Sequence, residues 1–172
     1  MATLIIVESC YGNTSAVAEA IGETLDSMAA MSTRLVQVQD APETIPDGTD
    51  LLVLAAPTHD YSLPTHKTRL KAHRRGAIRF HPIGLREWIA AVPPIPDLQI
   101  VTVDTAFKTG FVPSTAGKAA AKLLKRKGFE QVHRGATFFV TDHSGPLDEG
   151  ELIRAQAWAN TLASLVKATA GT

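Results

Sequence analysis

The sequence is poor in several features that would narrow its function at once. It contains one cysteine in 172 residues, so no internal disulfide can form, and such usage is typical of a reducing compartment. Its formal net charge is zero, which gives the chain as a whole no electrostatic reason to bind nucleic acid or an anionic membrane. The longest strongly apolar run, Leu51–Pro57, is far too short to span a bilayer. We therefore expect a soluble, cytoplasmic protein with no nucleic-acid and no membrane partner.

Other signals are missing as well. No secretory leader is expected, because Glu8 interrupts the first apolar run and no basic region precedes it. The six histidines show no ligand-like spacing, so no metal site is expected. Gly12 lacks the partner glycines of a dinucleotide-binding fingerprint, and Gly117-Lys118 lacks the flanking residues of a P-loop.

Five short apolar runs alternate with helical patterns. Nearly continuous apolar character is typical of parallel strands that are covered on both faces. The runs are Leu4–Val7, Leu35–Val38, Leu51–Ala55, Ile100–Val103 and Thr137–Val140. Helical patterns occur in four places: after the first run, over Leu85–Ala91, in a segment that ends at the stop signal Gly128, and in the C-terminal segment. This alternation predicts one α/β domain over residues 1–172, with a doubly wound parallel sheet.

In such sheets ligands bind beyond the carboxyl ends of the strands, where the winding reverses. The loops that follow predicted strands there are Glu8–Ser15, Pro57–Pro64 and Asp104–Pro113. In the first loop Ser9, Tyr11 and Thr14 carry hydroxyls, and Gly12 lets the backbone come close to a ligand just before a helix begins. Such a loop can bind an anion without a basic side chain. An ordinary strand–helix turn, capped by Asn13 or Thr14, explains the same residues.

Three segments resemble flavodoxins. SCYGNTSAVAEAI, residues 9–21, is similar to their phosphate loop and first helix, and DLLVLAAPTHDYSLP, residues 50–64, to their third strand and the loop after it. GPLDEGELIRAQAWANTL, residues 145–162, resembles the last helix of short flavodoxin-like proteins of actinobacteria. The similarity runs through most of the chain and is weakest over residues 64–98. It implies a flavodoxin-like five-stranded sheet of order 2-1-3-4-5 with FMN where the winding reverses, an architecture of which flavodoxin is a standard example.

The resemblance implies three groups of cofactor-binding residues. The FMN phosphate would lie against Ser9, Cys10, Tyr11, Gly12, Asn13 and Thr14. One side of the flavin ring would be bordered by Pro57, Thr58, His59, Asp60 and Tyr61. The pyrimidine end and the other face would be bordered by Asp104, Thr105, Phe107 and Gly110. Two positions depart from the family pattern. Tyr11 stands where flavodoxins usually have threonine, and His59 stands where they often have tryptophan, which leaves Tyr61 as the expected aromatic wall.

Several of these residues also have simpler interpretations. Cys10, just before a helix, is either a thiol with a lowered pKa or a small residue whose backbone faces the phosphate. Tyr61 and Phe107 are either walls of a flavin site or aromatic loop anchors that pack on the core. Asp104 either orients the flavin or ends its strand as a turn-former. His143 is expected to be a surface loop residue.

The sequence leaves three functions open. The first is an FMN-binding redox protein that passes electrons to a partner. The second is an FMN-dependent NAD(P)H:quinone-type oxidoreductase, in which the flavin itself carries the chemistry, so that no catalytic side chain needs to be assigned. The third is a flavodoxin-fold binding module that has lost FMN.

A basic segment bears on this choice, because typical flavodoxins are strongly acidic. Residues 66–81 contain no acidic residue, and their basic residues are Lys67, Arg69, Lys71, Arg74, Arg75 and Arg79. A solvated helix face explains such a run. A docking surface for an acidic redox partner, or for the phosphates of NAD(P)H, explains it as well.

Overall fold

A computed structural model describes residues 1–28, 31–108 and 113–170. Its five strands are β1 (Ala2–Val7), β2 (Ser32–Gln37), β3 (Thr49–Pro57), β4 (Gln99–Phe107) and β5 (Val132–Val140). They pair in parallel in the order β2-β1-β3-β4-β5. The predicted α/β class and the strand order are therefore confirmed.

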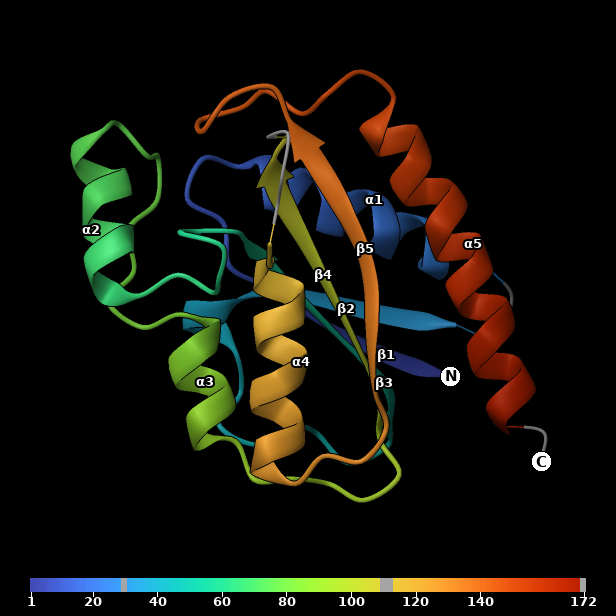
Figure 1. The fold of residues 1–172 in the computed structure, drawn as a ribbon. Helices are drawn as coiled ribbons and strands as arrows, with labels where there is room; N and C mark the ends of the chain where they lie inside the picture. Colours follow the sequence, from blue (N-terminus) through green and yellow to red (C-terminus); the bar gives the residue numbers. More distant parts are fainter. Residues whose placement is uncertain (29–30, 109–112, 171–172) are drawn as a thin grey trace.

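Helices cover both faces of this sheet (Figure 1). They are α1 (Asn13–Asp26), α2 (His66–Arg74), α3 (Leu85–Ala91), α4 (Ala116–Lys127) and α5 (Glu151–Ala170), and a 3₁₀ turn, η1 (Val38–Asp40), follows β2. Successive strand residues point to opposite faces. Ile5 and Val53 pack with α1 and α5, whereas Leu4 and Leu52 pack with α3 and α4. Both faces are thus buried, which explains the nearly continuous apolar runs.

All five strands begin before the expected runs, and the differences at β2, β4 and β5 matter most. β4 continues to Phe107, so the prediction of a loop beginning at Asp104 is wrong, and Val38 belongs to η1 rather than to β2. β5 begins at Val132, earlier than predicted. The prediction missed this start because β5 is an edge strand, and its exposed residues His133 and Arg134 are polar and interrupt the apolar run.

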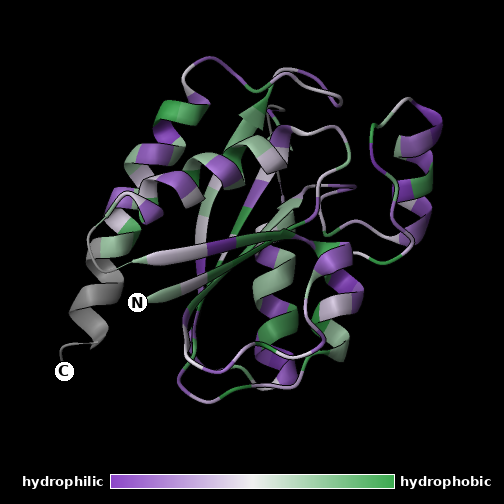
Figure 2. Cartoon of the chain, turned by 180° about the vertical axis from the view of Figure 1, so that it is seen from behind, coloured by the Kyte–Doolittle hydropathy of each residue, from purple (hydrophilic) through white to green (hydrophobic). Residues whose placement is uncertain are grey.

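Helix α2 lies apart from the sheet, beside the edge where the strands end (Figure 1). It is mostly hydrophilic in Figure 2. Its apolar contact with the rest of the chain is small. Ala72 of α2 packs in a cluster with Cys10, Tyr11 and Ala77. Across the described residues, no helix has both the length and the apolar character needed to cross a membrane.

Candidate functional site

The loop between β1 and α1 offers unpaired hydrogen-bond donors. Gly12 precedes the helix with a φ of 93°, a conformation that favours glycine. The Ser9 hydroxyl accepts hydrogen bonds from the N–H groups of Gly12, at 3.1 Å, and of Ser15, at 3.3 Å. Within the loop, five N–H groups find no acceptor in the described part of the chain: those of Ser9, Cys10, Tyr11, Asn13 and Thr14. Free donors at the positive end of a helix dipole form a cradle for an anion.

Side chains of the same loop tie it to three other elements. The Tyr11 hydroxyl donates to the Ala72 carbonyl of α2 at 3.2 Å, so this hydroxyl is turned away from the cradle. The Asn13 amide donates to a carbonyl in the β5–α5 loop at 3.1 Å. The hydroxyls of Thr14 and Thr105 lie 2.8 Å apart in a buried contact between α1 and β4. The loop is therefore held in shape by neighbouring segments on three sides.

Cys10 in this loop is buried, with 5 % of its surface exposed. Burial, together with the negative charge of Glu8, raises the pKa of its thiol to about 12. The thiol is therefore protonated at neutral pH, and the interpretation of Cys10 as a thiol with a lowered pKa is wrong.

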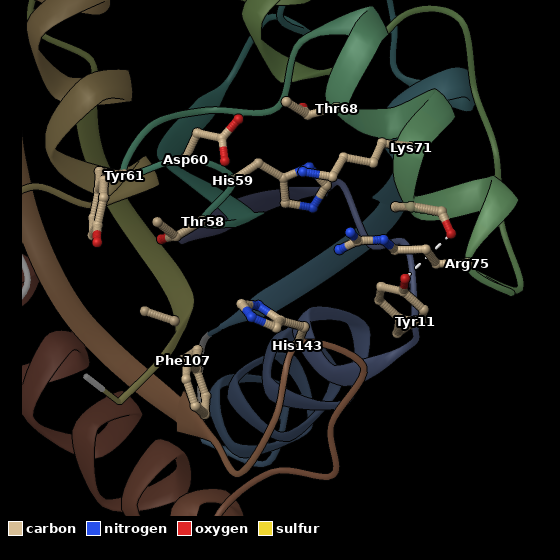
Figure 3. Close-up of a pocket in the computed structure, with 12 residues that line it drawn as sticks. Tyr11, Thr58, His59, Asp60, Tyr61, Thr68, Lys71, Arg75, Phe107 and His143 are labelled. Carbon is tan, nitrogen blue, oxygen red and sulfur yellow. Dashed lines mark hydrogen bonds between the residues drawn. The ribbon is translucent and has the colours of Figure 1, made fainter.

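A hollow of about 250 Å³ opens beside the loop (Figure 3). A narrower hollow of about 40 Å³ continues from it to the anion cradle. The predicted residues that line one or both of them are Ser9, Cys10, Tyr11, Asn13, Thr14, Pro57, Thr58, His59, Asp60, Tyr61, Thr105 and Phe107. We call the two together the ring pocket. Residues from all three predicted loop regions therefore meet at one place.

Aromatic rings border the ring pocket. His59 and Ser62 exchange two backbone hydrogen bonds, and the residues between them, Asp60 and Tyr61, have φ angles of 49° and 61°. This tight turn presents Tyr61, half exposed, at the rim. On the other side the Phe107 ring lies 5.0 Å from that of His143, at an angle of 42°.

His143 was expected to be a surface loop residue, and it is exposed. Its place in the lining of the ring pocket was not predicted. The signal was present, because His143 follows the carboxyl end of β5 and so lies at the edge of the sheet where ligands bind.

The ring pocket is electropositive on its α2 side. Lys71 and Arg75 point from the end of α2 into it, opposite Phe107 and His143 (Figure 3). Burial lowers the pKa of His59 to about 4; Asp60 opposes this shift, and the nearby cations reinforce it. His59 is therefore a neutral ring at pH 7, and the fixed positive charge comes from α2.

Two predicted residues do not line the ring pocket. Asp104 is buried within β4 and accepts a hydrogen bond of 2.7 Å from the N–H of Gly117, at the start of α4. Its burial raises the pKa of the carboxyl group. Gly12 contributes backbone to the loop but not to the lining, and Gly110 lies outside the described residues.

The described part of the chain contains no cluster of side chains suited to a metal ion.

Arg69 was expected to be part of the docking surface, and this prediction is wrong because the residue is buried. Only 2 % of it is exposed, because its guanidinium lies 3.3 Å from the carboxylate of Glu8 and 2.9 Å from that of Glu87. It also donates to the carbonyls of Pro64 and Pro82. This buried charge network joins the end of β1 to α2 and α3, and sequence reasoning missed it because a basic residue in a basic run is normally exposed.

Comparisons with known proteins bear on the fold. No known family model matches this sequence, and no curated protein is similar to it at the level of sequence. Flavodoxin 1 of Bacillus cereus superposes with a TM-score of 0.65 at 14 % identity, over 95 % of this chain and 98 % of that one. A flavodoxin from the domain Archaea gives 0.60 at 16 % identity, over 97 % and 99 %.

A larger protein contains the same architecture. The rubredoxin:oxygen oxidoreductase of Desulfovibrio gigas gives a TM-score of 0.63 at 14 % identity, over 99 % of this chain and 37 % of that one. At such identities the likeness concerns architecture alone. The resemblance seen in the sequence is therefore confirmed at that level: this chain has the flavodoxin fold.

Proposed function

We propose that the chain binds FMN at the carboxyl edge of the sheet and works as a flavodoxin-like redox protein. The observation that carries this proposal is the set of unpaired N–H donors at the start of α1, placed beside a hollow bordered by aromatic rings. The donor set suits a phosphate monoester, and the rings suit a flat ligand. When bound, FMN supplies the one- and two-electron chemistry that side chains lack.

The residues divide into three roles. The N–H groups of Tyr11, Asn13 and Thr14, with the Thr14 hydroxyl, would hold the phosphate without any basic side chain. The rings of His59, Tyr61, Phe107 and His143 would border the flavin. Lys71 and Arg75 would place positive charge beside it, which stabilises negative charge that the flavin gains on reduction. This last feature departs from the acidic surroundings of typical flavodoxins.

The first experiment compares FMN with riboflavin, which lacks the phosphate. Each is titrated into the purified chain, and binding is followed by the visible spectrum and by quenching of flavin fluorescence. We expect FMN to bind in the micromolar range or tighter, and at least tenfold tighter than riboflavin, because the cradle acts on the phosphate alone. If neither flavin binds at micromolar concentration, both redox functions are excluded and a binding module is left.

A variant pair tests the cradle itself. Thr14→Val removes a hydroxyl at the start of α1, and we expect FMN to bind about tenfold more weakly or worse, because a hydrogen bond to a charged group is worth roughly 1.5–3 kcal/mol. Riboflavin affinity should stay unchanged. Thr24→Val is the matched control, because the Thr24 hydroxyl bonds only to the Ala20 carbonyl in the last part of the same helix. Equal losses for FMN and riboflavin in Thr14→Val would place the phosphate elsewhere.

A second function is favoured by the cations of α2. Residues 66–81 would then dock NAD(P)H, and the chain would be an FMN-dependent NAD(P)H:quinone-type oxidoreductase rather than a carrier that docks an acidic redox protein there. Adding NADPH to the FMN-loaded protein without oxygen separates the two. Rapid bleaching of the flavin spectrum supports the oxidoreductase, and an unchanged spectrum supports the carrier.

A further inference from the structure

A second, larger hollow lies next to the ring pocket. Its volume is about 740 Å³, and it lies between α2 and the loop that leads from β3 to α2. Four cationic side chains at α2 and its C-terminal end line it: Lys67, Lys71, Arg74 and Arg75. We call this hollow the α2 groove.

These four cations are not neutralised by the protein. None of them has an ion-pair partner in the part of the chain that the structure describes. Asp60 is the single acidic residue in the lining of the α2 groove. Arg86, by contrast, is used to fix the groove wall, since it donates to the Ser62 hydroxyl and to the carbonyls of Leu63 and Pro64. Like charges held this close repel one another, so a ligand with several negative charges is favoured there.

The shape of the α2 groove points to a small molecule. Its volume lies within the range of about 300–1,000 Å³ that is usual for small-molecule sites. Leu63 and Leu70 add apolar surface to a lining that is otherwise cationic and polar. A protein partner would instead need a broad surface of about 800 Å² on each side.

The α2 groove is continuous with the ring pocket. His59, Asp60, Thr68, Lys71 and Arg75 line both hollows. A ligand held by its phosphates in the α2 groove can therefore extend a flat ring toward the rings of His59 and Tyr61. That combination, several phosphates at one end and a flat ring at the other, describes a phosphorylated nicotinamide dinucleotide.

We propose that the α2 groove binds the phosphates of a phosphorylated nicotinamide dinucleotide and directs its ring end toward the ring pocket, where the flavin would lie. Arginine suits this task because its planar fork makes two hydrogen bonds to one phosphate. The choice of ligand rests on the proposed flavin function, but the phosphate site itself belongs to the α2 groove and does not require the flavin.

The test measures binding of NADPH and NADH to the full chain, with and without added FMN, by calorimetry. NADPH carries one more phosphate than NADH, so we expect it to bind at least tenfold tighter, and more weakly as salt is raised. The double variant Lys67→Gln/Arg74→Gln removes two cations that line the α2 groove but not the ring pocket. It should weaken NADPH binding at least tenfold and leave FMN binding unchanged.

The matched control is Lys122→Gln/Arg126→Gln, which removes the same charges from the exposed face of α4. It should leave NADPH affinity unchanged. Equal affinity for NADPH and NADH, or equal losses in the two double variants, would overturn the proposal and leave the α2 cations to a protein partner. FMN binding without NADPH binding defeats this proposal alone. NADPH binding without FMN binding upholds the phosphate site while the proposed flavin function fails.

Discussion

A single residue, His59, makes the stability of the fold depend on pH. Its pKa is lowered from 6.5 to about 4, so between these values the folded protein binds fewer protons than the unfolded chain. The free energy of unfolding therefore falls as the pH is lowered through that range, and we expect His59 to cost about 2 kcal/mol between pH 7 and pH 5.

Chemical denaturation at both pH values measures this loss. In His59→Asn the fall in the free energy of unfolding between pH 7 and pH 5 should be about 2 kcal/mol smaller than in the unchanged protein. His81, whose pKa is also lowered by burial, is present in both proteins and cancels from the comparison. If the free energy of unfolding falls equally in the two proteins, the pKa of His59 is not lowered by folding, and the prediction is contradicted.

Site residues that directly follow a strand could be predicted from the sequence. Features that depend on contacts between distant parts of the chain could not. Ser9 and Thr58 could be found because the carboxyl ends of parallel strands meet at one edge of the sheet. The orientation of Tyr11 could not, since its hydroxyl bonds to Ala72, a carbonyl 61 positions away. The burial of Arg69 was equally hidden, because only the folded chain brings Glu8 and Glu87 to it.

At the scale of elements, one buried charged side chain ties α2 to the strands and to α3. Arg69 links it to β1 and α3, and its loss would leave the buried carboxylate of Glu8 without its ion-pair partner. We expect Arg69→Ala to lower the free energy of unfolding by about 3–5 kcal/mol, measured by urea denaturation. Arg74→Ala in the same helix changes an exposed residue and should cost no more than about 0.5 kcal/mol. Similar small losses in both variants would show that α2 is held by other contacts.

The elements themselves were predictable to different degrees. Strands β1, β3 and β4 are buried on both faces, so an apolar run marks each of them. The start of β5 carries no such mark, because His133 and Arg134 face solvent at the edge of the sheet. Helix α2 could be inferred only as one explanation of a basic run, since most of its residues are polar and its buried residues are only Arg69 and Ala72.

Across the whole molecule, the zero net charge conceals a separation of charge. Residues 1–60 hold nine acidic side chains and one basic one, whereas residues 61–134 hold fourteen basic and four acidic ones. In space, exposed acids of α1 such as Glu19 and Glu23 lie on the opposite face of the sheet from exposed cations of α4 such as Lys118 and Lys122. The molecule is therefore a dipole that approaches charged partners in a preferred orientation.

This dipole predicts unusual behaviour on ion-exchange resins. At pH 7 and low salt we expect the protein to be retained by both cation and anion exchangers, because each resin sees one charged face. Physiological salt shortens the range of these fields to about 8 Å and should release the protein. Lys118→Gln/Lys122→Gln should elute earlier from the cation exchanger and unchanged from the anion exchanger. Passage through both resins without delay would contradict the separation of charge.

The charge network around Arg69 also restricts how this sequence can change over time. A methyl group on Gly84 would come within 2.6 Å of the charged atoms of both Arg69 and Glu8, so a larger residue there would force these two side chains out of their paired positions. Loss of Arg69 alone strands the buried carboxylate of Glu8. Substitutions at Glu8, Arg69 and Gly84 are therefore strongly non-additive, and a lineage can replace the network only by changing its members together.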